Sequence, residues 1–103
     1  MSTKKVFTIL ATQPDVTSAG TPERIIATDL WVEECLIEAP ATNTGVIYIN
    51  SSNATGTNRH TLQPGQFMTI STSSRAAATF NLKEIWFDGA TSADKIVVSY
   101  LEA

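Results

Sequence analysis

Short runs of residues that favour β-strands recur along this chain at intervals of about 8–12 residues, separated by clusters of Gly, Pro, Asn and Ser. This spacing suits strands joined by turns and does not suit long helices. We therefore predict an all-β fold of about 7–8 short antiparallel strands, in a β-sandwich or a β-barrel. The expected strands cover residues 4–11, 23–30, 31–39, 45–50, 59–62, 66–71, 82–88 and 95–101.

The length of 103 residues matches one domain, so we expect a single β-sandwich over residues 1–103, with residues 1–5 as an N-terminal arm. A helical turn is the alternative for residues 32–38. Glu34, Leu36 and Glu38 alternate with Cys35, Ile37 and Ala39 there, which favours a strand with one apolar face. Pro64-Gly65 is typical of a type II turn, because Pro presets φ and Gly accepts a positive φ.

The closing segments, 82–88 and 95–101, predict a hairpin around Asp88-Gly89, in which Gly89 supplies a positive φ. Large apolar side chains occur on both expected faces of this hairpin, so its second face needs a cover. A loop folded over it and a subunit interface are the alternatives. The interface hypothesis names Leu82, Trp86, Val97 and Leu101.

No group of residues suggests catalysis, and we expect a protein that is not an enzyme and needs no cofactor. His60 is the only histidine, stands in a polar segment, and is expected to be a surface residue. Cys35 is the only cysteine, so no intrachain disulfide can form and a zinc site lacks ligands. Asp88 and Asp94 are expected to shape a turn, with a calcium site as the alternative.

The formal net charge of −3 argues against direct binding of nucleic acid, which usually requires a basic patch. Lys4-Lys5 is the only basic pair. The apolar run after it is too short and too interrupted for a signal peptide, and no stretch reaches transmembrane length. We therefore expect no membrane contact and synthesis in a cytoplasm.

Three segments together resemble a pattern found in small virion proteins of tailed bacteriophages. In these proteins Thr-Gly precedes an apolar strand, and an Asn/Ser-rich loop, Leu-x-Pro-Gly and two final strands around Asp-Gly follow. The corresponding segments here are Thr44–Asn50, Leu62–Gly65, and Leu82–Gly89 with Asp94–Leu101. The resemblance covers about residues 44 to 102, a little over half the chain.

Within that group the chain is most similar to capsid decoration (cement) proteins, which are jelly-roll-like sandwiches on the outside of the phage head. The resemblance implies a structural role at the head surface after synthesis in a bacterial host, with the major capsid protein as partner and a homo-oligomer, most simply a trimer. Lys4 and Lys5 would then form an arm that contacts the capsid. A neck, tail or baseplate protein is one alternative. A glycan- or host-surface-binding module using Trp31, Tyr48 or Trp86 is the other.

Overall fold

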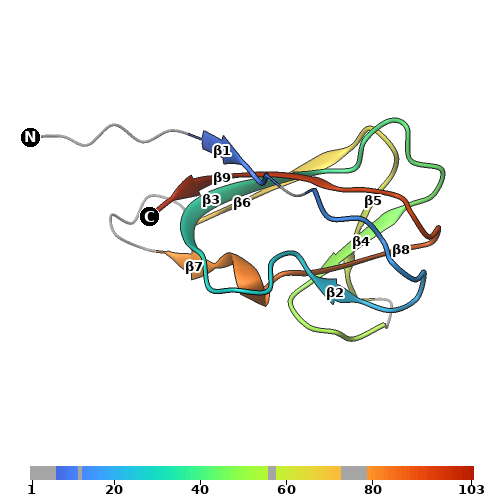
Figure 1. Ribbon diagram of the computed structural model, residues 1–103, viewed down its shortest axis with the longest axis horizontal. Coiled ribbons are helices and arrows are strands. Elements are labelled where there is room, and N and C mark those ends of the chain that lie inside the picture. Colours follow the sequence, from blue (N-terminus) through green and yellow to red (C-terminus); the bar gives the residue numbers. More distant parts are fainter. Residues whose placement is uncertain (1–6, 12, 56–57, 73–78) are drawn as a thin grey trace, which may run out of the picture.

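The computed structural model describes residues 7–11, 13–55, 58–72 and 79–103 of the chain (Figure 1). The predicted arm, with Lys4 and Lys5, lies outside these residues. The described part contains nine strands and one short 3-10 helix. In chain order they are β1 (Phe7–Ile9), β2 (Glu23–Arg24), β3 (Trp31–Glu38), β4 (Ile47–Asn50), β5 (His60–Leu62), β6 (Phe67–Ser71), β7 (Phe80–Asn81), η1 (Leu82–Glu84), β8 (Trp86–Gly89) and β9 (Val97–Glu102).

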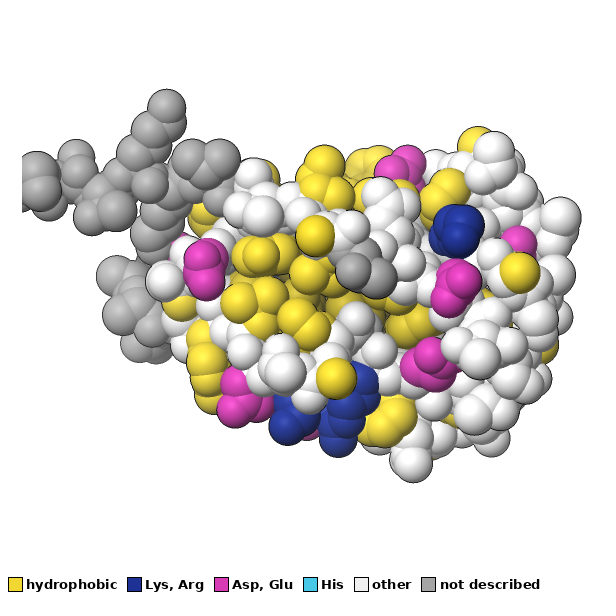
Figure 2. Space-filling model, viewed as in Figure 1, with side chains coloured by type: hydrophobic (Ala, Val, Ile, Leu, Met, Phe, Trp, Pro, Cys, Tyr) yellow, Lys and Arg dark blue, Asp and Glu magenta, His cyan; other side chains and the backbone are white. Residues whose placement is uncertain are grey.

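The strands form two antiparallel sheets, and the predicted all-β fold is confirmed. The five-stranded sheet has the order β1-β9-β3-β6, with β7 also paired to β3, and the four-stranded sheet has the order β2-β8-β4-β5. Apart from the short strand β7, this is the strand order of a jelly roll. Figure 1 shows the two sheets as layers, and Figure 2 shows hydrophobic side chains between them.

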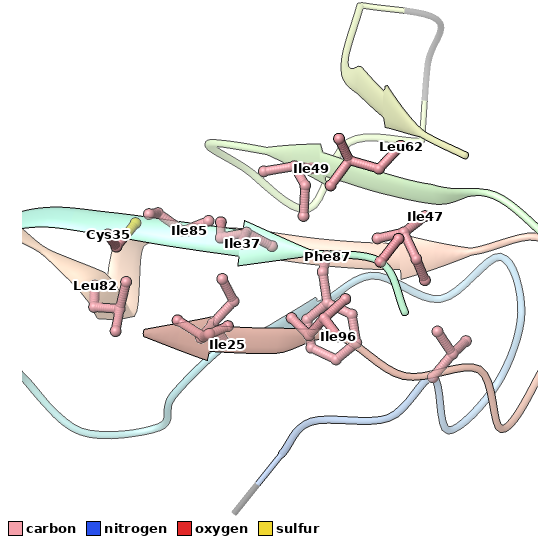
Figure 3. Close-up of a cluster of buried hydrophobic side chains, with 13 residues drawn as sticks. Ile25, Cys35, Ile37, Ile47, Ile49, Leu62, Leu82, Ile85, Phe87 and Ile96 are labelled. Carbon is pink, nitrogen blue, oxygen red and sulfur yellow. The ribbon is translucent and has the colours of Figure 1, made fainter. Parts of the chain in front are cut away.

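The core lies between the inner faces of the two sheets (Figure 3). On β3, Cys35 and Ile37 are fully buried, as is Ala39 just beyond its end, whereas Leu36 and Glu38 are half-buried. This alternation confirms the predicted strand. Buried side chains of the four-stranded sheet and its flanking loops complete the core, and they include Ile25, Ile47, Ile49, Leu62, Ile85 and Phe87.

The predicted hairpin between residues 82 and 101 is wrong. Strand β8 pairs with β2 and β4, whereas β9 pairs with β1 and β3, so residues 90–96 cross from one sheet to the other. Gly89 is a strand residue whose φ is not positive; a Cβ on it would lie 2.7 Å from Cγ2 of Val16. Close packing between segments, and not turn geometry, is the reason for this glycine.

Two other local predictions have different outcomes. Gln66 N donates to Gln63 O at 2.9 Å and Gly65 has φ +91°, which confirms the tight turn around Pro64-Gly65. The strand predicted for residues 23–30 ends at Arg24. Beyond it, Leu30 N donates to the side chain of Asn81, 51 positions along the chain, in place of a bond of the sheet ladder.

Candidate interaction surfaces

The four most exposed large hydrophobic side chains of the described residues all belong to the five-stranded sheet. Phe7, Ile9, Trp31 and Phe67 are between 51% and 63% exposed. Strand alternation places Trp31 and Phe67 opposite the core, because their neighbours Val32 and Met68 point inward. Phe7 and Ile9 lie on the same side, because they are paired with Leu101 and Ser99 of β9. We call this surface the outer face, and it consists of Phe7, Ile9, Trp31, Glu34, Leu36, Glu38, Phe67, Thr69, Ser71, Val97, Ser99 and Leu101.

The register of the sheet makes the outer face continuous across four strands. Phe7 is paired with Leu101, and Leu101 is paired with Glu34. At the other end Val97 is paired with Glu38, which is in turn paired with Phe67. Directly paired residues have Cβ atoms about 4.5–5.5 Å apart, so these side chains are near neighbours. Residues from distant parts of the sequence therefore form one surface, on which exposed apolar side chains alternate with polar ones.

The charges on the outer face are negative. Glu34 and Glu38 lie on it and are half-buried, and neither makes an ion pair within the described residues. The described Lys and Arg residues lie on other parts of the molecule: β2, the segment before β5, η1 and the 90–96 crossing. In Figure 2 hydrophobic and acidic side chains appear along the upper side, and basic side chains appear at the lower edge and at the upper right.

The outward side of the four-stranded sheet is different, because arginines of the same chain cover its aromatic rings. The Arg24 guanidinium lies 4.5 Å from the ring centroid of Trp86 and donates to Lys83 O at 2.7 Å. The Arg59 guanidinium lies 3.7 Å from the ring centroid of Tyr48. Each guanidinium thus makes a cation–π contact with one of these rings within the monomer. Sequence reasoning missed both pairs, since Arg24 and Trp86 become neighbours only through the β2–β8 register.

The four residues of the predicted interface are separated by the structure. Leu82 is fully buried in the core, so its side chain is not available to a partner. Trp86 lies on the outward side of the four-stranded sheet beneath Arg24, and Val97 and Leu101 lie on the outer face of the other sheet. The cover that Trp86 requires is thus supplied by a side chain, an alternative that the sequence did not suggest.

A cleft of about 880 Å³ opens between the two sheets near β5 and β6. Its apolar lining comes from Ile49, Met68, Ile70, Phe80 and Ile85. Polar side chains, including those of Asn50, Asn58, His60 and Asn81, complete the lining. His60 is exposed, as expected, although it lies on strand β5 and not in a loop.

The buried carboxylates have structural partners. Asp94 accepts from Thr44 N and Gly45 N, at 3.0 and 2.8 Å, and Asp88 accepts from Gly20 N and Gly89 N, at 3.0 and 2.7 Å. Oδ2 of Asp88 also lies 3.6 Å from Nη1 of Arg59. Backbone donors thus occupy the positions considered for calcium, and the described residues contain no group of three or more potential metal ligands.

The side chain of Cys35 is part of the core. Cys35 is fully buried, and burial raises the pKa of its thiol to about 12, so it stays protonated and unreactive.

Among the described residues, no helix is both long and apolar enough to cross a membrane. No protein-family model, curated protein or solved structure matches the chain.

Proposed function

We propose that this chain is a non-enzymatic structural protein of a tailed-bacteriophage virion, and specifically a capsid decoration protein that binds and stabilises the outer surface of the head. The observation that carries the proposal is the outer face. A contiguous apolar sheet face of this kind marks an interaction surface on a protein of this size. The major capsid protein is the proposed partner, after synthesis in the cytoplasm of the bacterial host.

The segments that resemble phage proteins support this proposal through the fold. Thr44 and Gly45 are held by Asp94, and Pro64 and Gly65 form a turn. In such a pattern, these residues would therefore form turns and anchor loops. Function is carried by the surface that these turns position, and the proposed homotrimer would add further contact area on the head.

The positions of the three aromatic residues considered for glycan binding favour the decoration role over a shared sugar-binding platform. Trp31 lies on the five-stranded sheet, while Tyr48 and Trp86 lie on the other one. Arginine side chains already cover the rings of Tyr48 and Trp86. A sugar that stacked on these two rings would have to displace both arginines, and it would find no shared platform with Trp31.

Copy number in purified virions tests the proposal. A decoration protein should be present in proportion to the capsid subunits, whereas a neck or tail ring would contain roughly 6–12 copies by its rotational symmetry. Purified heads lacking the protein should also bind it in solution, and binding should raise the temperature at which the heads disrupt. A ring-like copy number, or heads that do not bind the protein, would contradict the decoration role.

Phe67→Ser identifies the surface involved in that binding. It removes the most exposed aromatic of the outer face and should weaken binding to heads by tenfold or more, as expected for an anchor residue. Thr61→Ser, an exposed position of the four-stranded sheet, is the control and should bind like the wild type. If both variants bind heads with equal affinity, the docking site does not lie on the outer face.

A further inference from the structure

We propose that the partner of the outer face is an apolar surface bearing Lys or Arg opposite Glu34 and Glu38, and not a second copy of this chain. The identification of that partner with the capsid rests on the proposed function. The preference for a basic, non-self partner rests on the charges of the face alone, and it is tested separately.

The first step concerns what happens to Glu34 and Glu38 when the face is covered. Glu38 sits between the apolar side chains of Val97 and Phe67, and Glu34 sits between Leu101 and Ser71. A partner that buries Phe67 or Leu101 must also remove water from these carboxylates. Desolvating a carboxylate is costly unless a cationic group or hydrogen-bond donors meet it. Lys or Arg side chains supply both the charge and the donors, so a partner that presents them at these two positions fits the face best.

Among the described residues, the outer face of a second copy does not supply those charges. In a symmetric dimer the same surface occurs on both subunits, so each outer face would meet another outer face. Within the described residues that face has two carboxylates and no Lys or Arg. Like charges brought together at an interface cost several kcal/mol. An isologous dimer through the outer face is therefore disfavoured.

Contact between the outer face and the opposite side of a second copy has a different problem. The two outward sides of a sandwich point in opposite directions, so such a contact would add copies in a line and would not close into a ring. The basic groups there are also engaged: Arg24 donates to Lys83 O, and Arg59 lies 3.6 Å from Asp88. A separate partner with unpaired basic residues satisfies the outer face more simply.

The test compares two double variants that remove the same charge. Glu34→Gln with Glu38→Gln neutralises the outer face. Asp15→Asn with Glu84→Gln removes two carboxylates elsewhere, both of them exposed and ion-paired, and is the matched control. Each protein is first measured alone by sedimentation equilibrium, and then by titration onto purified heads.

Measured alone, the Glu34→Gln, Glu38→Gln protein should self-associate at least tenfold more tightly than the control, because repulsion across the face is gone. Adding Phe67→Ser to it should abolish that gain. The inference is overturned if neutralisation weakens self-association, or if Phe67→Ser alone dissociates a wild-type oligomer. The variant Lys4→Gln with Lys5→Gln is measured in the same way. If the wild type forms an oligomer and this variant does not, a neighbouring copy supplies the basic groups, and the inference is overturned.

On heads, the Glu34→Gln, Glu38→Gln variant should show the opposite effect. It should bind about tenfold more weakly than the wild type, as expected for the loss of two interfacial charge pairs. The control should change affinity less than twofold. Heads that fail to bind even the wild type would overturn the proposed function and leave the sedimentation result intact. Heads that bind the neutralised protein as well as the wild type would overturn the basic-partner inference while the decoration role stands.

Discussion

At the scale of single residues, Gly89 shows how closely the crossing segments approach the four-stranded sheet. A Cβ built on Gly89 lies 2.7 Å from Val16 Cγ2 and 3.4 Å from Ile47 Cδ1, and Val16 and Ile47 are both fully buried. Overpacking of this kind costs about 1–3 kcal/mol. We therefore predict that Gly89→Ala lowers the free energy of unfolding by about 2 kcal/mol in urea denaturation.

Val16 supplies the control for this prediction. Val16→Ala removes the methyl group that the new Cβ would meet, so the double variant should lose less stability than the sum of the two single variants. Gly45→Ala is a second comparison, because its Cβ would meet the Thr91 side chain, which can rotate away. Additive losses at Gly89 and Val16 would show that the glycine is needed for another reason.

Cys35 gives a prediction about alkaline pH. Burial raises the pKa of its thiol from 9.0 to about 12. Below pH 9 the thiol is neutral in both states; above pH 9 the unfolded chain loses the proton while the folded chain keeps it. The stability of the wild type relative to Cys35→Ala should thus fall by about 1.4 kcal/mol per pH unit above 9. Denaturation of both proteins between pH 8 and 10.5 measures this difference, and a constant difference would contradict it.

At the scale of elements, local sequence patterns predicted individual strands and turns correctly, but they did not predict which distant strands pair. Alternation of polar and apolar residues identified the strand around Cys35 and Ile37, and Pro64-Gly65 identified its turn, because both signals lie within a few residues. The hairpin of residues 82–101 failed because alternation does not say which sheet a strand joins. Residues 82–88 combine a 3-10 turn, in which Leu82 is buried, with a short strand, and this produced apolar residues in both registers.

The outer face could not be predicted from the sequence for the same reason. Phe7 and Phe67 are 60 positions apart and become part of one surface only through the order β1-β9-β3-β6. Val97 and Leu101 were identified as interface residues because each is apolar on the second face of its strand, and both do lie on the outer face. Trp86 was grouped with them only because β8 and β9 were expected to pair.

The crossing loops at one end of the sandwich provide the prediction at this scale. Asp94, in the β8–β9 loop, accepts from Thr44 N and Gly45 N in the β3–β4 loop. Asp94→Ala leaves these donors without their charged acceptor and should lower the free energy of unfolding by about 2–3 kcal/mol. Asp15→Ala, which removes an exposed ion pair with Lys95, is the control and should cost less than about 1 kcal/mol. Equal losses in urea denaturation would show that the two loops are not clamped by Asp94.

At the scale of the whole molecule, the jelly roll is built from pairings between distant segments. Within the described residues, β4 and β5 are the one pair of sheet neighbours that follow each other in the chain. The strands β1 and β9, near the two ends of the sequence, are neighbours in the five-stranded sheet. Such topologies fold slowly because loop closure precedes the contacts that reward it, and refolding should take milliseconds to seconds.

A circular permutant tests whether closing the chain ends limits that rate. Joining Ala103 to Met1 and opening the exposed loop between Ser18 and Ala19 keeps every sheet pairing and makes β9 and β1 consecutive. The loop that their pairing closes becomes about tenfold shorter, which lowers the entropic cost by about 2 kcal/mol. Stopped-flow refolding should then accelerate, by up to about thirtyfold if β1–β9 pairing is complete in the transition state. An unchanged rate, with stability retained, would show that β1 docks only after the transition state and that pairings within the inner strands limit folding.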